Sequence, residues 1–423
     1  MRPGLNSIIL IFFLLLLDIY VFQAIRAMVY MSAPRVRNIT YTIYWFISIS
    51  CLLMVALLPY INWHSWPPVL KSYLMAIFMG LVVAKLLVSV FLLIDDLRRG
   101  VVWIIRRFSG STPAVPDGSG VVSGLTRSQF LNRLGLIAGG TLFASLVYGF
   151  SNKYNYRIHR IKMGFKHLPN TFRGMRIVQI SDIHSGSFAN REAVLKGIKM
   201  INDQKPDLVL FTGDLVNDRA VEMTDWMDVF REVKAPMGVY STLGNHDYGD
   251  YYPWPDKTPN GYSAMQHANL DQVKALHGEL GWKLMMNENV VLERGGEKIA
   301  LIGVENWSSI KRFPRYGDLK RAYEGVADIP FKILMSHDPT HWDAQVRPEY
   351  PDISLTLAGH THGMQFGVEI PGLKWSPAQY FYKQWAGLYK KGDQFLYVNR
   401  GFGFLGYPGR VGILPEITVI DLT

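Results

Sequence analysis

The sequence predicts an α-helical membrane region followed by an α/β domain. Three long apolar runs fill the first hundred of its 423 residues. After residue 153, short β-branched runs alternate with segments of helical period. Hydrophobic residues make up 49% of the chain and the mean hydropathy is +0.09, both high for a soluble enzyme. A chain of this length has room for two or more domains.

Residues 1–108 are predicted to hold three membrane helices, because each apolar run is near the roughly 20 residues that a membrane helix needs. The runs are residues 8–25, 40–60 and 69–94. A cleaved signal peptide would explain the first run but not all three. The charges at Asp95–Arg99 end the third apolar run abruptly. Val101–Arg107 then resembles an interfacial segment, with Trp103 at the depth of the lipid headgroups.

A linker and a fourth helix are predicted next. Residues 109–126 are rich in Ser, Gly and Pro and should be flexible. Residues 127–152 should form a short fourth membrane helix, in which Gly135 and Gly139 are spaced for close helix packing. The segment Thr126–Leu131 resembles a twin-arginine export signal with one arginine missing. An internal membrane helix is the alternative interpretation.

Two ionisable residues lie inside the apolar runs. Asp18 and Lys85 sit in the C-terminal halves of the first and third runs, whose helices must point the same way. An ionisable side chain inside the membrane is energetically costly and is usually paired with another polar group. The sequence therefore predicts an intramembrane ion pair, with snorkelling of each side chain as the alternative.

The loop arginines predict the orientation of the chain. They lie between the first and second runs (Arg26, Arg35, Arg37) and between the third and fourth (Arg98, Arg99, Arg106, Arg107, Arg127, Arg133). Positive loops stay cytoplasmic, so the N-terminus should be outside and the fourth helix should carry residues 153–423 to the outer face of a bacterial inner membrane. The same loops explain the net charge of +10, so we expect no nucleic-acid partner.

Residues 153–423 read as a globular domain with strands and helices. Arg157–Lys162 should be an edge strand, and Asn190–Asn202 and Leu270–Leu280 have the period of amphipathic helices. The Gly-Gly pair within Val290–Ile302 predicts a β-hairpin.

Five short apolar runs of this domain each end in Gly or Ser followed by metal-ligating side chains. The runs are residues 175–180, 208–211, 239–243, 331–335 and 353–358. The ligating residues after them are Asp182, His184, Asp214, Asn245, His246, His337, His360 and His362. Ligands in open α/β sheets bind outside the carboxyl ends of strands, so five strand ends can supply one site. Carboxylate, imidazole and amide groups suit Zn, Mn or Fe, and the single Cys51 excludes a thiolate site.

These blocks resemble the motifs of the calcineurin-like metallophosphoesterases, in particular membrane-linked bacterial members. The family motifs D-x-H, G-D, G-N-H-D/E, H and G-H-x-H occur here in that order. The resemblance covers about the C-terminal two thirds of the chain. It implies two mixed β-sheets packed as a sandwich and flanked by helices, which accommodates both the predicted helices and the hairpin.

The resemblance also implies a role for each residue. Asp182, His184 and His362 would hold one divalent or trivalent metal ion, Asn245, His337 and His360 a second, and Asp214 would bridge both. His246 would be a general acid or a donor to the phosphoryl oxygen, with further metal ligation as its alternative. Asp247 would hold and charge that imidazole. Gly359 and Gly363 would let the backbone approach the metals.

The predicted function is hydrolysis of a phosphate ester by metal-activated water, with a phospholipid or nucleotide-linked lipid among the candidate substrates. The alternatives are a UDP-2,3-diacylglucosamine pyrophosphatase of lipid A synthesis, acting on the cytoplasmic side, and a catalytically silent binding module. Transport would need more polar residues along the helices.

Two further segments have alternative interpretations. Tyr248–Trp254 is either a wall of the substrate cleft or an ordinary loop. Arg400 and Arg410 either contact substrate phosphate or form structural salt bridges.

Overall fold

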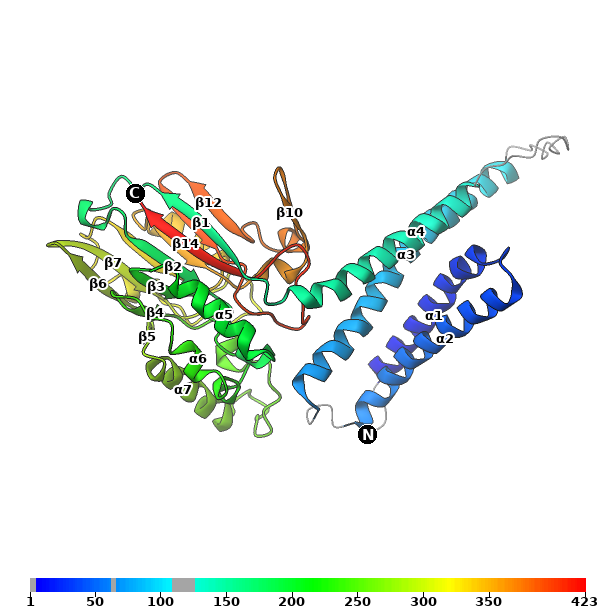
Figure 1. The fold of residues 1–423 in the computed structure, drawn as a ribbon, viewed down its shortest axis with the longest axis horizontal. Helices are drawn as coiled ribbons and strands as arrows, with labels where there is room; N and C mark the ends of the chain where they lie inside the picture. The colour runs from blue at the N-terminus through cyan, green and yellow to red at the C-terminus, as the bar shows by residue number, and fades with distance from the viewer. Residues whose placement is uncertain (1–4, 62–65, 109–125) are drawn as a thin grey trace. The chain divides into compact units, whose positions relative to one another are not determined.

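The computed structural model describes residues 5–61, 66–108 and 126–423 (Figure 1). The predicted linker falls outside these residues apart from Thr126. The chain divides into a helical unit, Met1–Tyr148, and an α/β unit, Gly149–Thr423, which we call the catalytic unit because all the predicted ligand residues lie in it.

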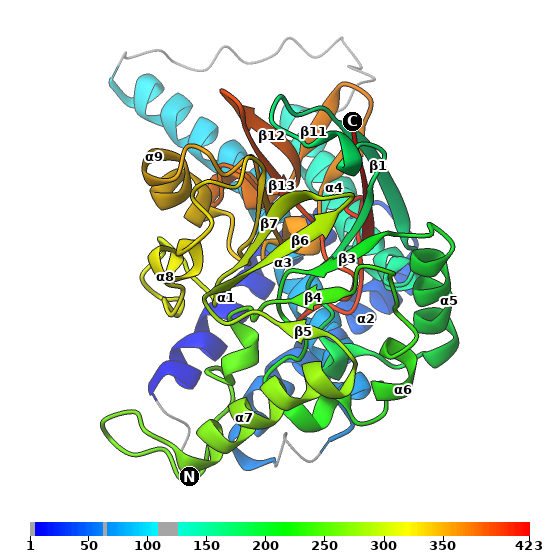
Figure 2. The same ribbon diagram turned by 90° about the vertical axis from the view of Figure 1, so that its left-hand side faces the viewer.

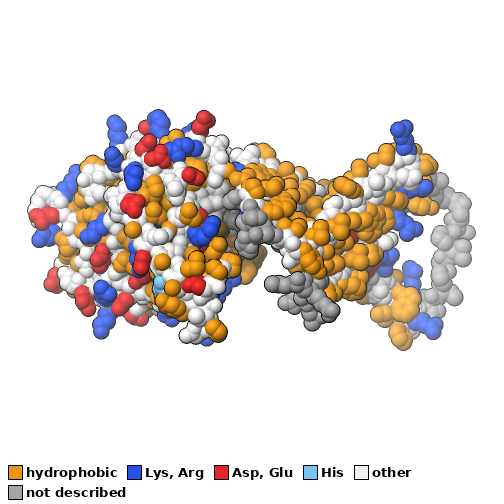
Figure 3. Space-filling view, turned by 90° about the horizontal axis from the view of Figure 1, so that it is seen from below, with side chains coloured by type: hydrophobic (Ala, Val, Ile, Leu, Met, Phe, Trp, Pro, Cys, Tyr) orange, Lys and Arg blue, Asp and Glu red, His pale blue; other side chains and the backbone are white. Residues whose placement is uncertain are grey.

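The helical unit consists, in its described residues, of four long helices and one short 3-10 turn. The helices are α1 (Leu5–Met28), α2 (Pro34–Leu57), α3 (Pro68–Phe108) and α4 (Arg127–Gly149). Each contains a stretch long and apolar enough to cross a membrane. The surface of this unit is largely hydrophobic, whereas acidic and basic side chains intermix over the catalytic unit (Figure 3). Lipid is therefore the solvent to which this surface is suited.

The third helix extends beyond its apolar run. The run ends before Asp95, but α3 continues to Phe108 without a break, so the segment Val101–Arg107 belongs to the same helix. The charges do not end the helix because they are paired. Asp95 accepts hydrogen bonds from Arg98, one turn further along, and from Ser128 of α4. At 1.5 Å per residue the helix is roughly 60 Å long, about twice the hydrocarbon thickness of a bilayer.

The fourth helix packs closely along the third. A Cβ atom on Gly139 would lie 2.9 Å from the carbonyl oxygen of Ala84, which supports the predicted role of the small residues. The helix begins with a reciprocal cap, since Gln129 N donates to Thr126 Oγ1 and Thr126 N donates to Gln129 Oε1. The segment that resembles an export signal is thus the capped start of an internal helix.

The predicted intramembrane ion pair is present. Lys85 Nζ lies 2.5 Å from Asp18 Oδ1, and Ser48 of α2 bonds to both side chains at 3.0 and 2.9 Å. Tyr44 donates to the Asp18 carbonyl. Three helices therefore converge on one buried charge pair, and neither charge is left facing lipid.

We expect a double-mutant cycle of Asp18→Asn and Lys85→Met to give a favourable coupling of about 0.5–3 kcal/mol. Each single change leaves the other polar group without its partner in a low-dielectric environment. The measurement is unfolding of the detergent-purified protein by sodium dodecyl sulfate. Gln23→Leu, an exposed change on the same helix as Asp18, is the control and should show no coupling with Lys85→Met. Additive effects of the first two changes would refute the pair.

The catalytic unit contains two six-stranded sheets and a small hairpin. The first sheet has the order β1 (Arg157–Met163), β14 (Glu416–Leu422), β2 (Arg176–Ile180), β3 (Leu208–Phe211), β4 (Val239–Ser241) and β5 (Lys283–Leu284). The second has the order β12 (Gly387–Lys391), β13 (Gln394–Val398), β9 (Leu355–Ala358), β8 (Lys332–Met335), β7 (Glu297–Gly303) and β6 (Glu288–Arg294). The hairpin is β10 (Val368–Ile370) with β11 (Leu373–Trp375). Both large sheets are mixed, which confirms the predicted fold.

Alternation along the buried strands explains the layers. In β2, Ile177 faces the core between the two sheets, whereas Val178 and Ile180 face the helices. In β8, Ile333 joins the same central core and Leu334 faces outward. Each sheet therefore buries one face against the other sheet and one against helices.

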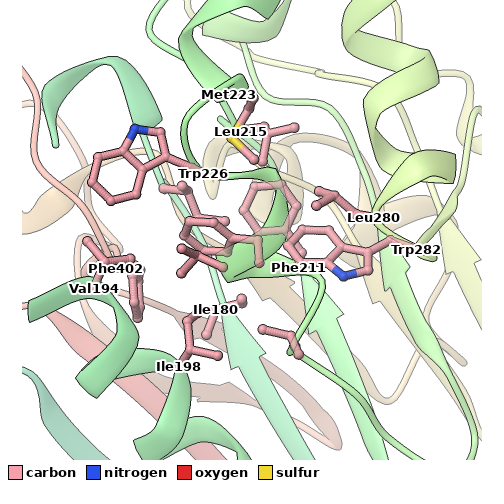
Figure 4. Packing of buried hydrophobic residues seen from close by; sticks show 14 of the residues in the cluster. Ile180, Val194, Ile198, Phe211, Leu215, Met223, Trp226, Leu280, Trp282 and Phe402 are labelled. Carbon is pink, nitrogen blue, oxygen red and sulfur yellow. The ribbon is translucent and has the colours of Figure 1, made fainter. Parts of the chain in front are cut away.

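The outer layers are helical (Figure 2). The first sheet is covered by α5 (Arg191–Asn202), α6 (Met227–Phe230) and α7 (Ala264–Glu279), and the second by α8 (Leu319–Tyr323) and the turn Trp342–Val346 before α9 (Arg347–Glu349). Figure 4 shows the first of these interfaces, where Val194 and Ile198 of α5 pack beside Ile180 and Phe402. The predicted helices and the predicted hairpin are all present. No strand is predicted after residue 363, so β10 to β14 are found only in the structure.

Candidate metal centre

The polar residues of the five predicted blocks meet at one edge of the sandwich. They follow β2, β3 and β4 of the first sheet and β8 and β9 of the second. Neighbouring strands in each of these sets are parallel, so their carboxyl ends lie side by side. All seven predicted ligands come together here, and the side chain of each, including that of His360, has at most a small exposed fraction.

Five of the seven predicted ligands have a left-handed backbone. The φ angles are 53° at Asp182, 48° at His184, 64° at Asp214, 72° at His360 and 49° at His362. Only nine non-glycine residues in the described parts of the chain have positive φ. Such a conformation costs on the order of 1–3 kcal/mol per residue and persists only where packing imposes it. The fold thus maintains strain at these positions, which is typical of functional sites.

One group of ligands contains Asp182, His184 and His362. The Nε2 atoms of the two histidines are 3.0 Å apart, and His362 Nε2 is 3.2 Å from Asp182 Oδ1. These nitrogen and oxygen atoms converge on one point in a buried setting. The donor set and spacing fit a divalent or trivalent cation.

A second group contains Asp214, His337 and His360. His360 Nδ1 lies 3.3 Å from His337 Nε2 and 2.7 Å from Asn245 Oδ1, so the predicted amide ligand is also in place. His337 Nδ1 lies 2.7 Å from the carbonyl oxygen of Thr212. That contact fixes the proton on Nδ1 and leaves Nε2 free as a ligand. This group therefore also fits a cation.

Asp214 connects the two groups. Its Oδ2 atom is 3.5 Å from His184 Nε2 in the first group and 3.1 Å from His337 Nε2 in the second. Its other oxygen accepts a hydrogen bond from His246 N. Gly244 packs so closely here that a Cβ atom would lie 2.1 Å from Asp214 Oδ1. Only glycine fits at this position.

The predicted roles of the two other glycines differ. A Cβ on Gly359 would lie 2.3 Å from Asp182 Oδ2, so this residue does allow a close approach to a ligand. A Cβ on Gly363 would instead contact Ile413 and Trp385. A glycine at position 363 therefore allows close packing and a φ of 54°, and it does not bring the backbone close to the metal ligands.

The charges of the two ligand groups are mutually compensated. Burial opposes ionisation of Asp214, but His337 and His246 outweigh burial and hold the pKa of Asp214 well below its usual range. Burial also lowers the pKa of His337, but the Asp214 carboxylate outweighs it and raises the pKa to about 10. Burial lowers the pKa of His184 and His360 below the usual value. A metal at the second group would therefore displace a proton from His337.

His246 lies beside the ligand groups, but its predicted partner is wrong. Its Nδ1 atom is 2.7 Å from the carbonyl oxygen of Asn217. The Asp247 carboxylate instead accepts four backbone N–H bonds, from Gly244, Asp214, Leu215 and Val216. Asp247 therefore fixes the loop after β3 to the loop after β4. Because each oxygen of the Asp247 carboxylate accepts two of these N–H groups, neither oxygen is available to bind the His246 imidazole.

Aromatic side chains line the rim of the site. Within the predicted aromatic loop, Tyr251 packs on His246 with ring centroids 4.5 Å apart and accepts a hydrogen bond from Asn245. Tyr382 Oη is 2.9 Å from His360 Nε2, and Phe313 meets the same ring edge-on at 4.7 Å. Sequence reasoning missed the last two, because they follow no motif and reach the site from separate loops.

The two C-terminal arginines are structural. Arg400 is buried and pairs with Glu416 at 2.5 Å and with Glu369 at 2.6 Å. Arg410 is fully buried and donates to the carbonyl oxygens of His362, Arg400 and Gly403. The salt-bridge interpretation holds for Arg400, while Arg410 fixes backbone carbonyls. Neither guanidinium is exposed to a substrate.

Comparison with known proteins gives the family. The model for "Probable Calcineurin-like phosphoesterase, transmembrane domain" matches residues 2–153, and that for "Calcineurin-like phosphoesterase" matches residues 175–364. The Bacillus subtilis protein "Uncharacterized metallophosphoesterase YkuE" is 32% identical over 309 residues, covering 70% of this chain and 98% of that protein.

Two further relatives cover less. "Transmembrane protein with metallophosphoesterase domain" of Danio rerio is 29% identical over 283 residues, which span 65% of this chain and 60% of that one. "UDP-2,3-diacylglucosamine pyrophosphatase LpxG" of Chlamydia muridarum is 26% identical over 288 residues, 58% of this chain and 81% of the other. All five blocks lie within the matched phosphoesterase region. The chain thus belongs to the calcineurin-like metallophosphoesterases and is a membrane protein with metal-dependent phosphoesterase chemistry.

Proposed function

We propose that this chain hydrolyses a phosphate ester at a two-metal centre. The ligands are Asp182, His184 and His362 for one ion, Asn245, His337 and His360 for the other, and Asp214 for both. The observation that carries the proposal is the position of Asp214 Oδ2, which lies within 3.5 Å of a histidine of each group. Carboxylate, imidazole and amide donors favour Mn, Zn or Fe.

The protein supplies position and proton transfer. Two bound cations would activate a water molecule and neutralise charge on the phosphoryl group. His246 donates a proton to the leaving oxygen through Nε2, because the Asn217 carbonyl holds the Nδ1 proton. Tyr251 packs on the imidazole and limits its rotation. The five ligands with a left-handed backbone keep that conformation because the loops are held by buried hydrogen bonds such as those to Asp247.

The substrate we favour is a lipid-linked phosphate ester. The four helices hold the catalytic unit at a membrane, where such esters are concentrated. The similarity to a protein named for hydrolysis of UDP-2,3-diacylglucosamine supports a second candidate, a pyrophosphate-linked lipid nucleotide. The two candidates differ in the bond cleaved and in the side of the membrane on which the substrate is found.

The test is metal analysis of the detergent-purified chain together with hydrolysis of p-nitrophenyl phosphate, bis-p-nitrophenyl phosphate and UDP-2,3-diacylglucosamine. We expect about two metal ions per chain and hydrolysis of at least one substrate. Two metals without hydrolysis of any ester would favour a silent binding module. Less than one metal per chain after incubation with Mn, Zn and Fe would contradict the two-metal centre itself.

We expect the catalytic unit on the outer face of the membrane. The α1–α2 connection, the C-terminal end of α3 and the N-terminal end of α4 lie at one end of the helical unit, as the alternating directions of the helices require (Figure 1). Positive connections stay cytoplasmic, so the other end is outside. Alkaline phosphatase fused after Thr423 should be active and green fluorescent protein should be dark. The reverse pattern would reject this orientation and favour the cytoplasmic pyrophosphatase.

A further inference from the structure

An exposed apolar surface surrounds the hairpin β10–β11 of the catalytic unit. We call it the hairpin surface, and its residues are Val368 (39% exposed), Ile370 (58%), Leu373 (51%), Tyr380 (71%) and Phe381 (67%). Single exposed apolar residues are common and need no explanation. Here, however, five lie in two short segments that a hydrogen bond from Trp375 Nε1 to Tyr380 Oη joins. Such a cluster indicates a contact with another apolar phase.

The base of this hairpin lies beside the point where the chain leaves the fourth membrane helix. Gly149, the last residue of α4, accepts a hydrogen bond from Arg410 N, and a Cβ on it would lie 2.7 Å from Val411 Cγ2. On the hairpin side, Phe366 forms a β-bridge with Val411 and Gly367 N donates to the Val411 carbonyl. One short segment, 410–411, therefore contacts both. Within the catalytic unit, the hairpin therefore lies close to Gly149, the residue at which α4 ends.

The hairpin surface also adjoins the metal centre. The ligand His362 begins the turn that leads into Phe366 and the hairpin. At the other end, Tyr382 follows Phe381 directly and places its hydroxyl 2.9 Å from His360 Nε2. The surface is thus connected at both ends to residues that hold or touch the predicted ligands.

We propose that the hairpin surface inserts into the headgroup region of the bilayer that the four helices span. The occupant is a lipid surface, because the fourth membrane span ends at residue 152 and Gly149, near its end, contacts the segment 410–411 that also contacts the hairpin. Tyr, Trp and Phe side chains with adjoining lysines suit the interface. Glu369, the acidic residue of the hairpin, is neutralised by Arg400. The insertion brings headgroup phosphates to the metal site, a consequence that rests on the proposed function.

Spin labels in the full chain test this proposal. In a Cys51→Ser background, Leu373→Cys and Val291→Cys are labelled and placed in nanodiscs of phosphatidylcholine and phosphatidylglycerol. Val291 is the matched control, because it is 42% exposed on β6, the outer edge strand of the second sheet. The label at 373 should collide several-fold more with oxygen and several-fold less with a water-soluble nickel complex than the label at 291.

Two results would overturn the proposal. If the two labels respond alike, the hairpin surface faces water. If the label at 373 is immobile and shielded from both reagents, a protein partner or a second copy covers the surface instead of lipid. Both labelled proteins should hydrolyse bis-p-nitrophenyl phosphate as the unlabelled chain does, since neither site touches the metal centre. Loss of hydrolysis by the unlabelled chain as well would count against the proposed function, and the label comparison would still decide the docking.

Discussion

Replacing Asp214 by Asn should reduce phosphate-ester hydrolysis by about 10³-fold or more, the scale on which lost electrostatic stabilisation acts at a reacting centre. Asp214 Oδ2 contacts a histidine of each ligand group, so the change removes a negative charge that both cations would share. Asparagine also offers an N–H donor where His337 Nε2 must present a lone pair. Because one side chain serves both groups, metal content should fall at both sites together.

The measurement is metal content and turnover of the purified variant at several Mn concentrations. Asp225→Asn is the matched control, since Asp225 is an exposed aspartate outside the site and its change should alter neither quantity. Circular dichroism checks that the variant is folded. If Asp214→Asn bound two metals and turned over at the wild-type rate, the bridging role would be refuted.

His246→Ala should leave both metals bound while slowing turnover by about 10²–10⁴-fold, the usual contribution of general acid catalysis. His246 stands beside the ligand groups, with its ring centroid 4.9 Å from that of His184, but Nδ1 is used by the Asn217 carbonyl. The proton it gives matters most when the leaving oxygen is basic. The loss should therefore be larger for phenyl phosphate than for p-nitrophenyl phosphate.

A leaving-group series and metal analysis separate this role from its alternative. His267→Ala, an exposed histidine of α7, is the control and should turn over at the wild-type rate. If His246→Ala lost one metal and regained its rate when that metal was added, His246 would be a ligand and not an acid. An equal loss for both leaving groups would also contradict proton donation.

The sequence could predict those features that local patterns determine. The strands β2, β3, β8 and β9 lie within one or two residues of the predicted runs, because a strand buried on both faces must be continuously apolar. The ligands follow these strands directly, so a correct strand end also places the ligand. The Asp18–Lys85 pair was likewise predictable, since the two depths follow from residue counts within apolar runs.

Features that depend on distant parts of the chain could not be predicted. β14 inserts between β1 and β2, which precede it by more than 230 residues, and only the assembled sheet makes that place available. An aspartate such as Asp247 can bind an imidazole, so its residue type suggested a contact with His246. The arrangement of the loops after β3 and β4 instead places four backbone N–H groups against its carboxylate. Asp95, inside α3, accepts a hydrogen bond from Ser128 of α4, a partner 33 residues further along the chain.

By itself, the sequence determined that this protein has membrane helices, an α/β unit and seven candidate metal ligands at strand ends, because apolar length, strand alternation and residue type are local properties. Tertiary structure alone decided which oxygen of Asp214 joins the two groups, which arginines are buried, and where the apolar hairpin lies relative to the metal centre. These are distances between residues far apart in the chain. They are set by how two sheets pack, and no local pattern contains them.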